Sequence, residues 1–372
     1  MNIPVFEPSL GREEFANVEE AFSTGAISGT FGRFISEFEE TFASYCGAKY
    51  GVATTSGTTA LHLALAAYGI GPGDEVVLST STNIATCLAV VYLGATPVVI
   101  DAERRTWNMD VDRVEEAITS RTKAIMPVHI YGHPVDMDPL IEIAEKHNLL
   151  VIEDAAEAHG AEYKGRKVGA LKDAGCFSFY ANKIITTGEG GMFITHNEKV
   201  AKHAASLKTL AFGEEVRFQH EHLGYNYRMS NLHAALGVGQ MKRIDSIIEQ
   251  KRQVAARYST LLTNVKGLTL PVEEPWAKNV YWMYALLVED EFGISRDDLM
   301  ARLREHGIGT RSFFIGMHAQ PVFHKMGLFR DQKCPVADDI AQRGLYLPSS
   351  LNLTDEEVAY VCDAITSIQA EQ

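Results

Sequence analysis

Apolar segments and amphipathic segments alternate along the first two-thirds of the chain. Four short runs are apolar almost throughout, not only at every second position, which is typical of parallel strands buried on both faces. Segments with helical periodicity lie between them. The predicted strands cover residues 74–80, 96–101, 123–132 and 149–154, and the predicted helices cover residues 58–70, 83–94 and 137–148. This alternation predicts an α/β fold with a mostly parallel central sheet.

The pattern changes toward the C-terminus. Residues 162–171 carry two glycine-centred turns and predict a short hairpin, and residues 232–265 predict one long amphipathic helix. A strand over 282–288 then precedes helices that begin at Ser295 and Thr354, because serine and threonine cap helix N-termini. The length also favours two domains. We expect a large α/β domain over residues 1–245 and a smaller α+β domain over residues 246–372.

Composition and charge exclude several classes of function. The 372 residues carry a formal net charge of -14, which leaves no basic stripe for a nucleic acid. No apolar run reaches the ~20 residues of a membrane span, and the first residues lack the pattern of a secretory signal. Five widely spaced cysteines without a C-x-x-C pair indicate reduced thiols. We therefore expect a cytoplasmic protein that binds neither nucleic acid nor a membrane.

The segment TTSGTTAL, residues 54–61, combines a strand end, a small-residue turn and a helix start. Unpaired N–H groups at a helix N-terminus, with hydroxyl groups beside them, form a site for an anion. An ordinary helix cap is the alternative interpretation. The chain contains no G-x-x-x-x-G-K-[ST] and no G-x-G-x-x-G motif, so a nucleoside triphosphate or a dinucleotide is not indicated.

Two further features follow in an informative order. Asp154 ends an apolar strand, where parallel sheets place their ligands, and about thirty residues later Lys183 lies in an almost uncharged stretch. Burial disfavours the charged form of a lysine and prepares it for Schiff-base chemistry. A phosphate site, a strand-end carboxylate and a neutral lysine are together what pyridoxal phosphate requires. The sequence therefore predicts this cofactor.

With these residues in place, the chain resembles the DegT-type sugar aminotransferases, pyridoxal-phosphate enzymes of fold type I. The resemblance covers nearly the whole chain. It rests on the segments GTFGRFISEFEE, TKAIMPVHIYG, VIEDAAEAHGA, NKIITTGEGG and GYNYRMSNLHAALG. Related sugar dehydratases carry histidine in place of the lysine, so Lys183 favours amino transfer.

The resemblance implies a role for each residue of the cofactor site. Lys183 is implied to be the catalytic residue, which binds the cofactor as a Schiff base and later moves a proton at the substrate carbon. Asp154 is implied to pair with the pyridine nitrogen, and Glu157 to lie near the phenolic oxygen of the cofactor.

The phosphate is implied to be held by backbone N–H groups of Gly57 and Thr58 and by the Ser178 hydroxyl. Asn226 is expected to reach the phosphate in the neighbouring subunit. The expected assembly is therefore a homodimer with shared active sites.

One residue departs from the family pattern. Relatives usually place an aromatic ring where this chain has Asn83, and that ring stacks on the cofactor. Asn83 cannot stack in this way, so either another residue covers the cofactor or the substrate pocket differs in shape. Arg33, Arg311 and His318 are candidates for contacts with sugar or phosphate oxygens. A surface arginine or a packed histidine is the alternative for each.

No metal site is expected. His220 and His222 have a spacing found in metal sites, but no third ligand is apparent in the sequence. Trp107, Trp276 and Trp282 are interpreted as packing residues.

The implied substrates are L-glutamate and a keto-sugar, in particular a nucleotide-linked 4-keto-6-deoxyhexose used for lipopolysaccharide O-antigen. Several alternatives stay open. The acceptor could be another keto-sugar, such as a keto sugar acid of the 8-amino-octulosonate type. The protein could instead be a pyridoxal-phosphate-dependent sugar dehydratase or a regulator without catalytic activity.

Overall fold

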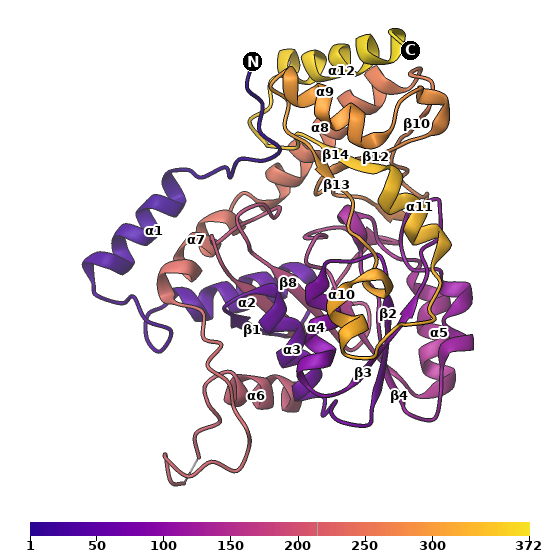
Figure 1. Cartoon of the computed structure of the whole chain (residues 1–372). Coiled ribbons are helices and arrows are strands. Elements are labelled where there is room, and N and C mark those ends of the chain that lie inside the picture. The colour runs from indigo at the N-terminus through magenta and orange to yellow at the C-terminus, as the bar shows by residue number, and fades with distance from the viewer. Residues whose placement is uncertain (214) are drawn as a thin grey trace.

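The computed structural model describes residues 1–213 and 215–372, and its centre is a seven-stranded sheet (Figure 1). In the described sheet only β9 runs antiparallel to its neighbours. The prediction of a mostly parallel α/β sheet is therefore confirmed. In spatial order the strands are β1 (Tyr50–Thr54), β9 (Gly191–Thr195), β8 (Ala174–Ser178), β5 (Leu150–Asp154), β4 (Thr122–Met126), β2 (Glu75–Ser79) and β3 (Thr96–Ile100).

Helices surround this sheet and continue into the C-terminal part of the chain. None of the described helices has the length and apolar character needed to cross a membrane. The helices are α1 (Arg12–Ser23), α2 (Phe34–Cys46), α3 (Gly57–Ala67), α4 (Ile84–Tyr92), α5 (Met137–His147), α6 (Glu198–Leu207), α7 (Asn231–Met241), α8 (Ile244–Leu262), α9 (Arg296–Glu305), α10 (Pro321–Lys325), α11 (Pro335–Arg343) and α12 (Asp355–Ala370).

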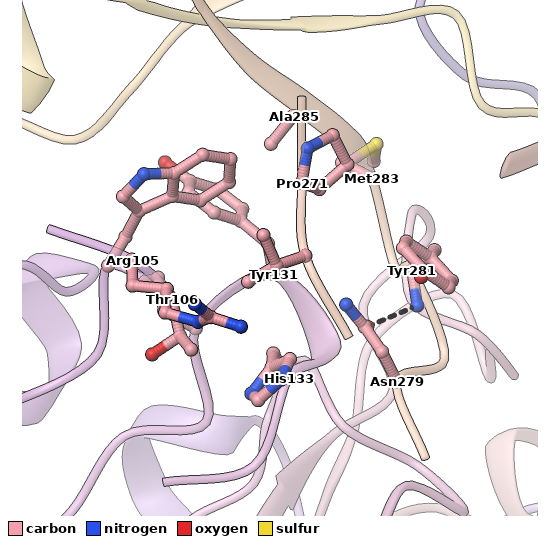
Figure 2. Close-up of a pocket in the computed structure, with 12 residues that line it drawn as sticks. Arg105, Thr106, Tyr131, His133, Pro271, Asn279, Tyr281, Met283 and Ala285 are labelled. Carbon is pink, nitrogen blue, oxygen red and sulfur yellow. Dashed lines mark hydrogen bonds between the residues drawn. The ribbon is translucent and has the colours of Figure 1, made fainter. Parts of the chain in front are cut away.

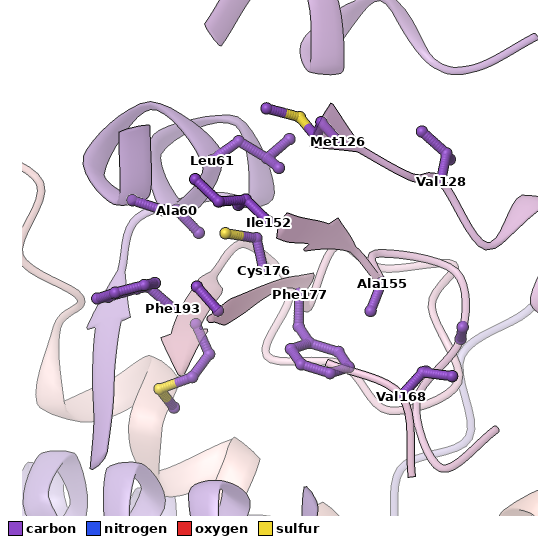
Figure 3. Close-up of a cluster of buried hydrophobic side chains, with 14 of the residues drawn as sticks. Ala60, Leu61, Met126, Val128, Ile152, Ala155, Val168, Cys176, Phe177 and Phe193 are labelled. Atoms are coloured by element: carbon purple, nitrogen blue, oxygen red, sulfur yellow. The ribbon is translucent and has the colours of Figure 1, made fainter. Parts of the chain in front are cut away.

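Both faces of the central sheet are covered because successive strand residues point to opposite sides. On β8, Cys176 lies on the side of α3, near Leu61, whereas Phe177 points away from that helix (Figure 3). On the opposite face, Phe177 packs against Phe42 of α2, with ring centroids 4.8 Å apart. All five residues of β8 are buried, and the strand carries no charged side chain.

A smaller sheet lies between two hydrophobic cores. Its strands alternate between the cores, so that Ala285 and Leu287 of β12 pack in the first core and Leu286 packs in the second. The second core also takes in Ile3, from the start of the chain. In spatial order the strands are β10 (Leu268–Thr269), β12 (Tyr284–Val288), β14 (Gly344–Leu347) and β13 (Arg311–Ser312), and a separate small sheet holds β6 (Glu162–Tyr163), β7 (Arg166–Lys167) and β11 (Ala277–Lys278).

The structure corrects two of the predicted elements. The helix predicted over 232–265 is two helices, because the Arg243 N–H bonds three residues back to the Gln240 carbonyl and α8 starts afresh at Ile244. The strand predicted over 123–132 ends at Met126, since Pro127 has no N–H to donate. The chain then makes a tight turn over Ile130–Gly132, in which Tyr131 has non-helical backbone angles. The hairpin predicted over 162–171 is confirmed by the β6–β7 pair.

The second core gives a matched test of stability at adjacent positions of α8. Leu262 is buried in this core, whereas Leu261 is half-exposed. Leu262→Ala is expected to lower the free energy of unfolding by about 2–5 kcal/mol, because it leaves a cavity. Leu261→Ala should cost less than about 1 kcal/mol. Urea unfolding followed by circular dichroism measures both, and equal losses would contradict the assignment of Leu262 to the core.

Candidate active site

A cavity of about 330 Å³ lies beyond the carboxyl ends of β2, β5 and β8. This is where parallel α/β sheets bind ligands. The start of α3, the loop between β8 and β9, and residues from the C-terminal third meet there. The lining residues are Ser56, Gly57, Thr58, Leu61, Thr82, Asn83, Ala85, Val128, Asp154, Ala156, Glu157, Ser178, Tyr180, Asn182, Lys183, Glu189, Trp282, Phe314 and Tyr346.

The start of α3 provides an anion site at one end of this cavity. Ser56 caps the helix, and its side chain accepts a hydrogen bond from Thr59 N–H. Gly57 and Thr58 follow and line the cavity beside Ser178. A Cβ at position 57 would lie 2.7 Å from the Ser178 Cβ, so only glycine lets the helix start approach this strand end. The predicted phosphate residues Gly57, Thr58 and Ser178 thus lie together.

Asp154 is the last residue of β5 and is buried. Its carboxylate accepts hydrogen bonds from the Thr86 hydroxyl at 2.7 Å and from Ala156 N–H at 3.1 Å. Burial raises the pKa of Asp154, and the two hydrogen bonds oppose that rise. A carboxylate held in this way is suited to pair with a cationic ring nitrogen.

Lys183 lies in the loop between β8 and β9, and its side chain is 11% exposed. Its Nζ is 3.6 Å from Glu157 Oε1 and 3.8 Å from the centroid of the Trp282 ring. Burial lowers the pKa of Lys183, and the nearby carboxylates of Glu157 and Asp154 oppose this effect. The environment therefore favours the neutral, nucleophilic amine more than water does.

Glu157 lines the same cavity as Lys183 and faces its amine. It is buried and accepts a hydrogen bond from Tyr131 N–H at 2.9 Å. Burial raises the pKa of Glu157 to about 7. Because burial raises the pKa of the acid and lowers that of the amine, the two pKa values lie closer together than they do in water.

The candidate substrate residues are distributed differently. Asn83 lines the cavity and caps α4, where its Oδ1 accepts a hydrogen bond from Ala85 N–H at 3.0 Å. Arg33 is exposed and pairs with Glu20, and Arg311 is exposed on β13. Neither arginine lines the cavity.

His318 and Asn226 also lie outside the cavity lining of their own chain. His318 is buried, and its ring nitrogens bond Thr80 at 2.8 Å and Asp338 at 3.0 Å. The Asn226 Oδ1 accepts a hydrogen bond from Arg228. The substrate role of His318 and the cross-subunit role of Asn226 therefore stay predictions.

Sequence reasoning missed residues that the fold brings to Lys183. Trp282 was interpreted as a packing residue, and it is buried, but its ring also lines the cavity and covers the lysine amine. Tyr131 binds Glu157 through its backbone, and Thr86 binds Asp154. Only Thr86 had a local signal, since it lies in the first turn of a predicted helix at a strand end.

The residues fit pyridoxal phosphate. The helix start at Gly57 suits a phosphate, the buried Asp154 suits the pyridine nitrogen, and the poorly hydrated amine of Lys183 suits an aldehyde. Within the described part of the chain, no three His, Cys, Asp or Glu side chains converge on a possible metal site.

The fold and the cavity together define a pyridoxal-phosphate-dependent transferase of fold type I. Residues 8–366 match the DegT/DnrJ/EryC1/StrS aminotransferase family, and the chain belongs to that family. It is thus a pyridoxal-phosphate-dependent aminotransferase. The family, the fold and the cofactor expected from the sequence are confirmed.

Individual relatives extend the comparison. The chain is 42% identical to the GDP-perosamine synthase of Caulobacter vibrioides, over 98% of both chains. It is 40% identical to that of Escherichia coli O157:H7, over 100% of this chain and 99% of the relative. The pyridoxal-phosphate form of a sugar aminotransferase described as putative, Spr1654 from Streptococcus pneumoniae, has a TM-score of 0.92 at 26% identity, covering 100% of this chain and 98% of that one.

The raised pKa of Glu157 predicts a pH-dependent stability. Between its ordinary pKa of 4.5 and about 7, the folded cofactor-free protein holds a proton that the unfolded chain releases. Stability therefore falls as pH rises through this window, by at most about 1.4 kcal/mol per pH unit. Glu157→Gln removes this loss, so its stability relative to the wild type should increase from pH 4.5 to pH 7.

Urea unfolding at several pH values measures the difference between the two proteins. Glu19→Gln, at an exposed position, tests whether the trend belongs to position 157. A stability difference for Glu157→Gln that is the same at pH 5 and pH 7 would contradict the raised pKa.

Proposed function

We propose that this enzyme transfers the amino group of L-glutamate to a GDP-linked 4-keto-6-deoxyhexose. The observation that carries the proposal is full-length similarity to two GDP-perosamine synthases in a chain whose cavity brings Lys183, Asp154 and Glu157 together. We infer that the resulting aminosugar enters a surface polysaccharide such as the O-antigen of lipopolysaccharide.

The cavity residues divide the work between binding and proton transfer. When bound, pyridoxal phosphate would supply the electron sink that stabilises negative charge on the substrate carbon, and an aldehyde carbon that can hold the amino group. Gly57, Thr58 and Ser178 hold its phosphate, and Asp154 keeps its ring nitrogen protonated. The Thr86 hydroxyl orients the Asp154 carboxylate through its 2.7 Å hydrogen bond.

Lys183 carries the proton. Its Nζ, neutral when free, takes a proton from the α-carbon of the amino-acid donor in the first half-reaction. In the second half-reaction it delivers a proton to the sugar carbon that receives the amine. Glu157 Oε1, 3.6 Å away, stabilises the ammonium form between these steps. The reaction is therefore a ping-pong exchange of amine and oxygen between two substrates.

One observation favours a second substrate class. Lys183 is the only basic side chain among the described residues that line the cavity. A nucleotide diphosphate therefore finds no arginine or lysine there within a single chain. A keto-sugar acid without a nucleotide would need fewer cations, so it is the alternative acceptor.

We infer a homodimer from exposed apolar side chains. Figure 1 shows α1 and the loop after α6 projecting away from the sheet. Large apolar residues on and beside these segments are more than half exposed, and covering them with a second subunit would be favourable. They are Leu10, Phe15, Phe22, Phe31, Val216, Phe218 and Leu223. A second copy covering this surface would exclude it from water and would bring Asn226 to the partner's cavity.

We also infer that the enzyme works in the cytoplasm. All five cysteines are buried and unpaired in the described structure. Reduced thiols are typical of the cytoplasm.

Incubation with L-glutamate and a GDP-linked 4-keto-6-deoxyhexose should release one 2-oxoglutarate for each aminosugar formed. Lys183→Ala should lower this rate at least about a thousandfold, because nucleophile and proton carrier are lost together. Coupled detection of 2-oxoglutarate and mass spectrometry of the sugar measure both products. Turnover only with a nucleotide-free keto-sugar acid would overturn the proposed acceptor.

Lys251 provides a matched control. It is the other buried lysine whose pKa burial lowers, to about 7, and its Nζ donates to the Ser349 carbonyl outside the cavity. Lys251→Met should retain activity within about tenfold. Borohydride reduction of the loaded enzyme should attach the cofactor to Lys183, and attachment to Lys251 would overturn the assignment.

Shared active sites predict complementation between inactive subunits. Lys183→Ala and Asn226→Ala are each expected to be nearly inactive as homodimers. If Asn226 serves the neighbouring subunit, a mixed dimer has one site with both defects and one intact site. Co-expression at equal levels should restore about a quarter of wild-type activity. No restoration would show that Asn226 acts within its own chain or that the enzyme is not a dimer.

A further inference from the structure

Trp282 reaches the catalytic lysine from the part of the chain that forms the small sheet. It lies two residues before β12, and its indole is buried. The indole Nε1–H donates to the carbonyl of Asn182 at 2.6 Å, and the ring face lies 3.8 Å from Lys183 Nζ. The ring is thus fixed to the backbone beside the lysine while its face meets the amine.

Tyr131 supports this indole from the side of the large sheet. Its ring is nearly parallel to that of Trp282, with 9° between the planes and 6.3 Å between the centroids. It is equally parallel to the ring of Phe314, at 5.8 Å. The backbone N–H of the same Tyr131 donates to Glu157 Oε2. One residue therefore positions both groups that contact the amine, Trp282 through its ring and Glu157 through its backbone.

The conformation of Tyr131 is itself tightly fixed. Its φ of 52° lies in the left-handed region, which a tyrosine adopts only when its surroundings impose it. The preceding Ile130 N–H donates to Asn108 Oδ1 at 3.1 Å, and His129 bonds the buried Glu153 at 3.0 Å. Tyr131 also lines a cavity of about 10 Å³, which has room for one water molecule. Figure 2 shows Tyr131 among the residues around it.

We propose that Trp282 is a positioning residue that holds the Lys183 amine over its ring face whenever that amine is not bonded to the cofactor. A protonated amine over an indole face is stabilised by the negative charge of the ring face. The proton taken from the substrate carbon thus stays on Nζ, next to the position where it is needed again. In the proton transfer, the Nζ lone pair forms the new N–H bond and the electron pair of the broken C–H bond stays with the substrate.

The arrangement has a measurable consequence. Burial favours the neutral amine, while the indole face favours the ammonium, so removing the ring should lower the pKa of Lys183 further. The stabilisation of a desolvated cation by an aromatic ring corresponds to a change of about 5- to 30-fold in the ratio of ammonium to amine. This is a change of about one pKa unit.

The test compares Trp282→Leu, Trp282→Phe and wild type as cofactor-free proteins. Labelling of Lys183 by trinitrobenzenesulfonate, followed by peptide mass spectrometry from pH 6 to pH 11, gives its pKa independently of access to the reagent. Trp282→Leu should lower this pKa by about one unit, and Trp282→Phe should restore about half of the loss because it keeps an aromatic face. The kcat–pH profile of the loaded enzymes should shift in the same direction, with KM for L-glutamate changed less than threefold.

Trp276→Leu is the matched control. Trp276 packs against Tyr163 and His133 and does not line the active-site cavity, so its loss should leave the pKa of Lys183 unchanged. Thermal unfolding checks that each variant is folded. If Trp282→Leu does not fold, the test uses Trp282→Phe alone. The proposal would be overturned if the pKa of Lys183 in Trp282→Leu lay within about 0.2 units of the wild-type value. If only Trp282→Phe folds, the same limit applies to that variant.

This inference rests on the proposed role of Lys183, and the two can fail separately. Borohydride labelling of a lysine other than Lys183 would overturn the proposed function. Labelling of Lys183 together with an unchanged pKa in the Trp282 variants would overturn only the positioning role.

Discussion

Three ionisable side chains, Lys183, Glu157 and Asp154, share one poorly hydrated cavity, and the chemistry depends on the cost of charging them there. Burial lowers the pKa of the lysine and raises those of both carboxyl groups. The pKa values of the acids and the amine are therefore closer together than in water, which lowers the cost of moving a proton between these groups. In open water nearly all of the amine would be charged at neutral pH, and the charged form does not attack a carbonyl.

The topology of the sheet produces this burial. Asp154 and Ser178 end adjacent strands. After Ser178 the chain forms one loop, over residues 179–190, and then returns as the antiparallel strand β9. The loop that carries Lys183 is therefore closed at its base, where Phe179 N–H donates to the Gly190 carbonyl at 2.8 Å and Thr187 N–H donates to the Phe179 carbonyl at 2.9 Å. A lysine on such a loop cannot move far from the strand ends without breaking the sheet.

What could be predicted from the sequence was local. Asp154 ends an apolar strand, Gly57 opens a helix and Lys183 lies in an uncharged stretch. In each case the adjacent residues in the sequence indicate the structural environment of the site residue. The break at Arg243 was missed because hydrophobic periodicity continues across it. Tyr131 was missed for another reason. Its left-handed backbone and its contact with Glu157 arise from packing between segments distant in sequence, which no local pattern records.

Strand β12 links the amine to the small sheet. Its alternate residues pack in different cores, so it cannot shift without disturbing both. Trp282 lies two residues before this strand, and its indole contacts Lys183. Phe314, which follows β13 in the chain, stacks on Tyr131 and lines the same cavity. A movement of the small sheet would therefore change the surroundings of the amine as well as the shape of the substrate cavity. The surroundings of the amine and the shape of the substrate cavity thus both depend on one packed unit.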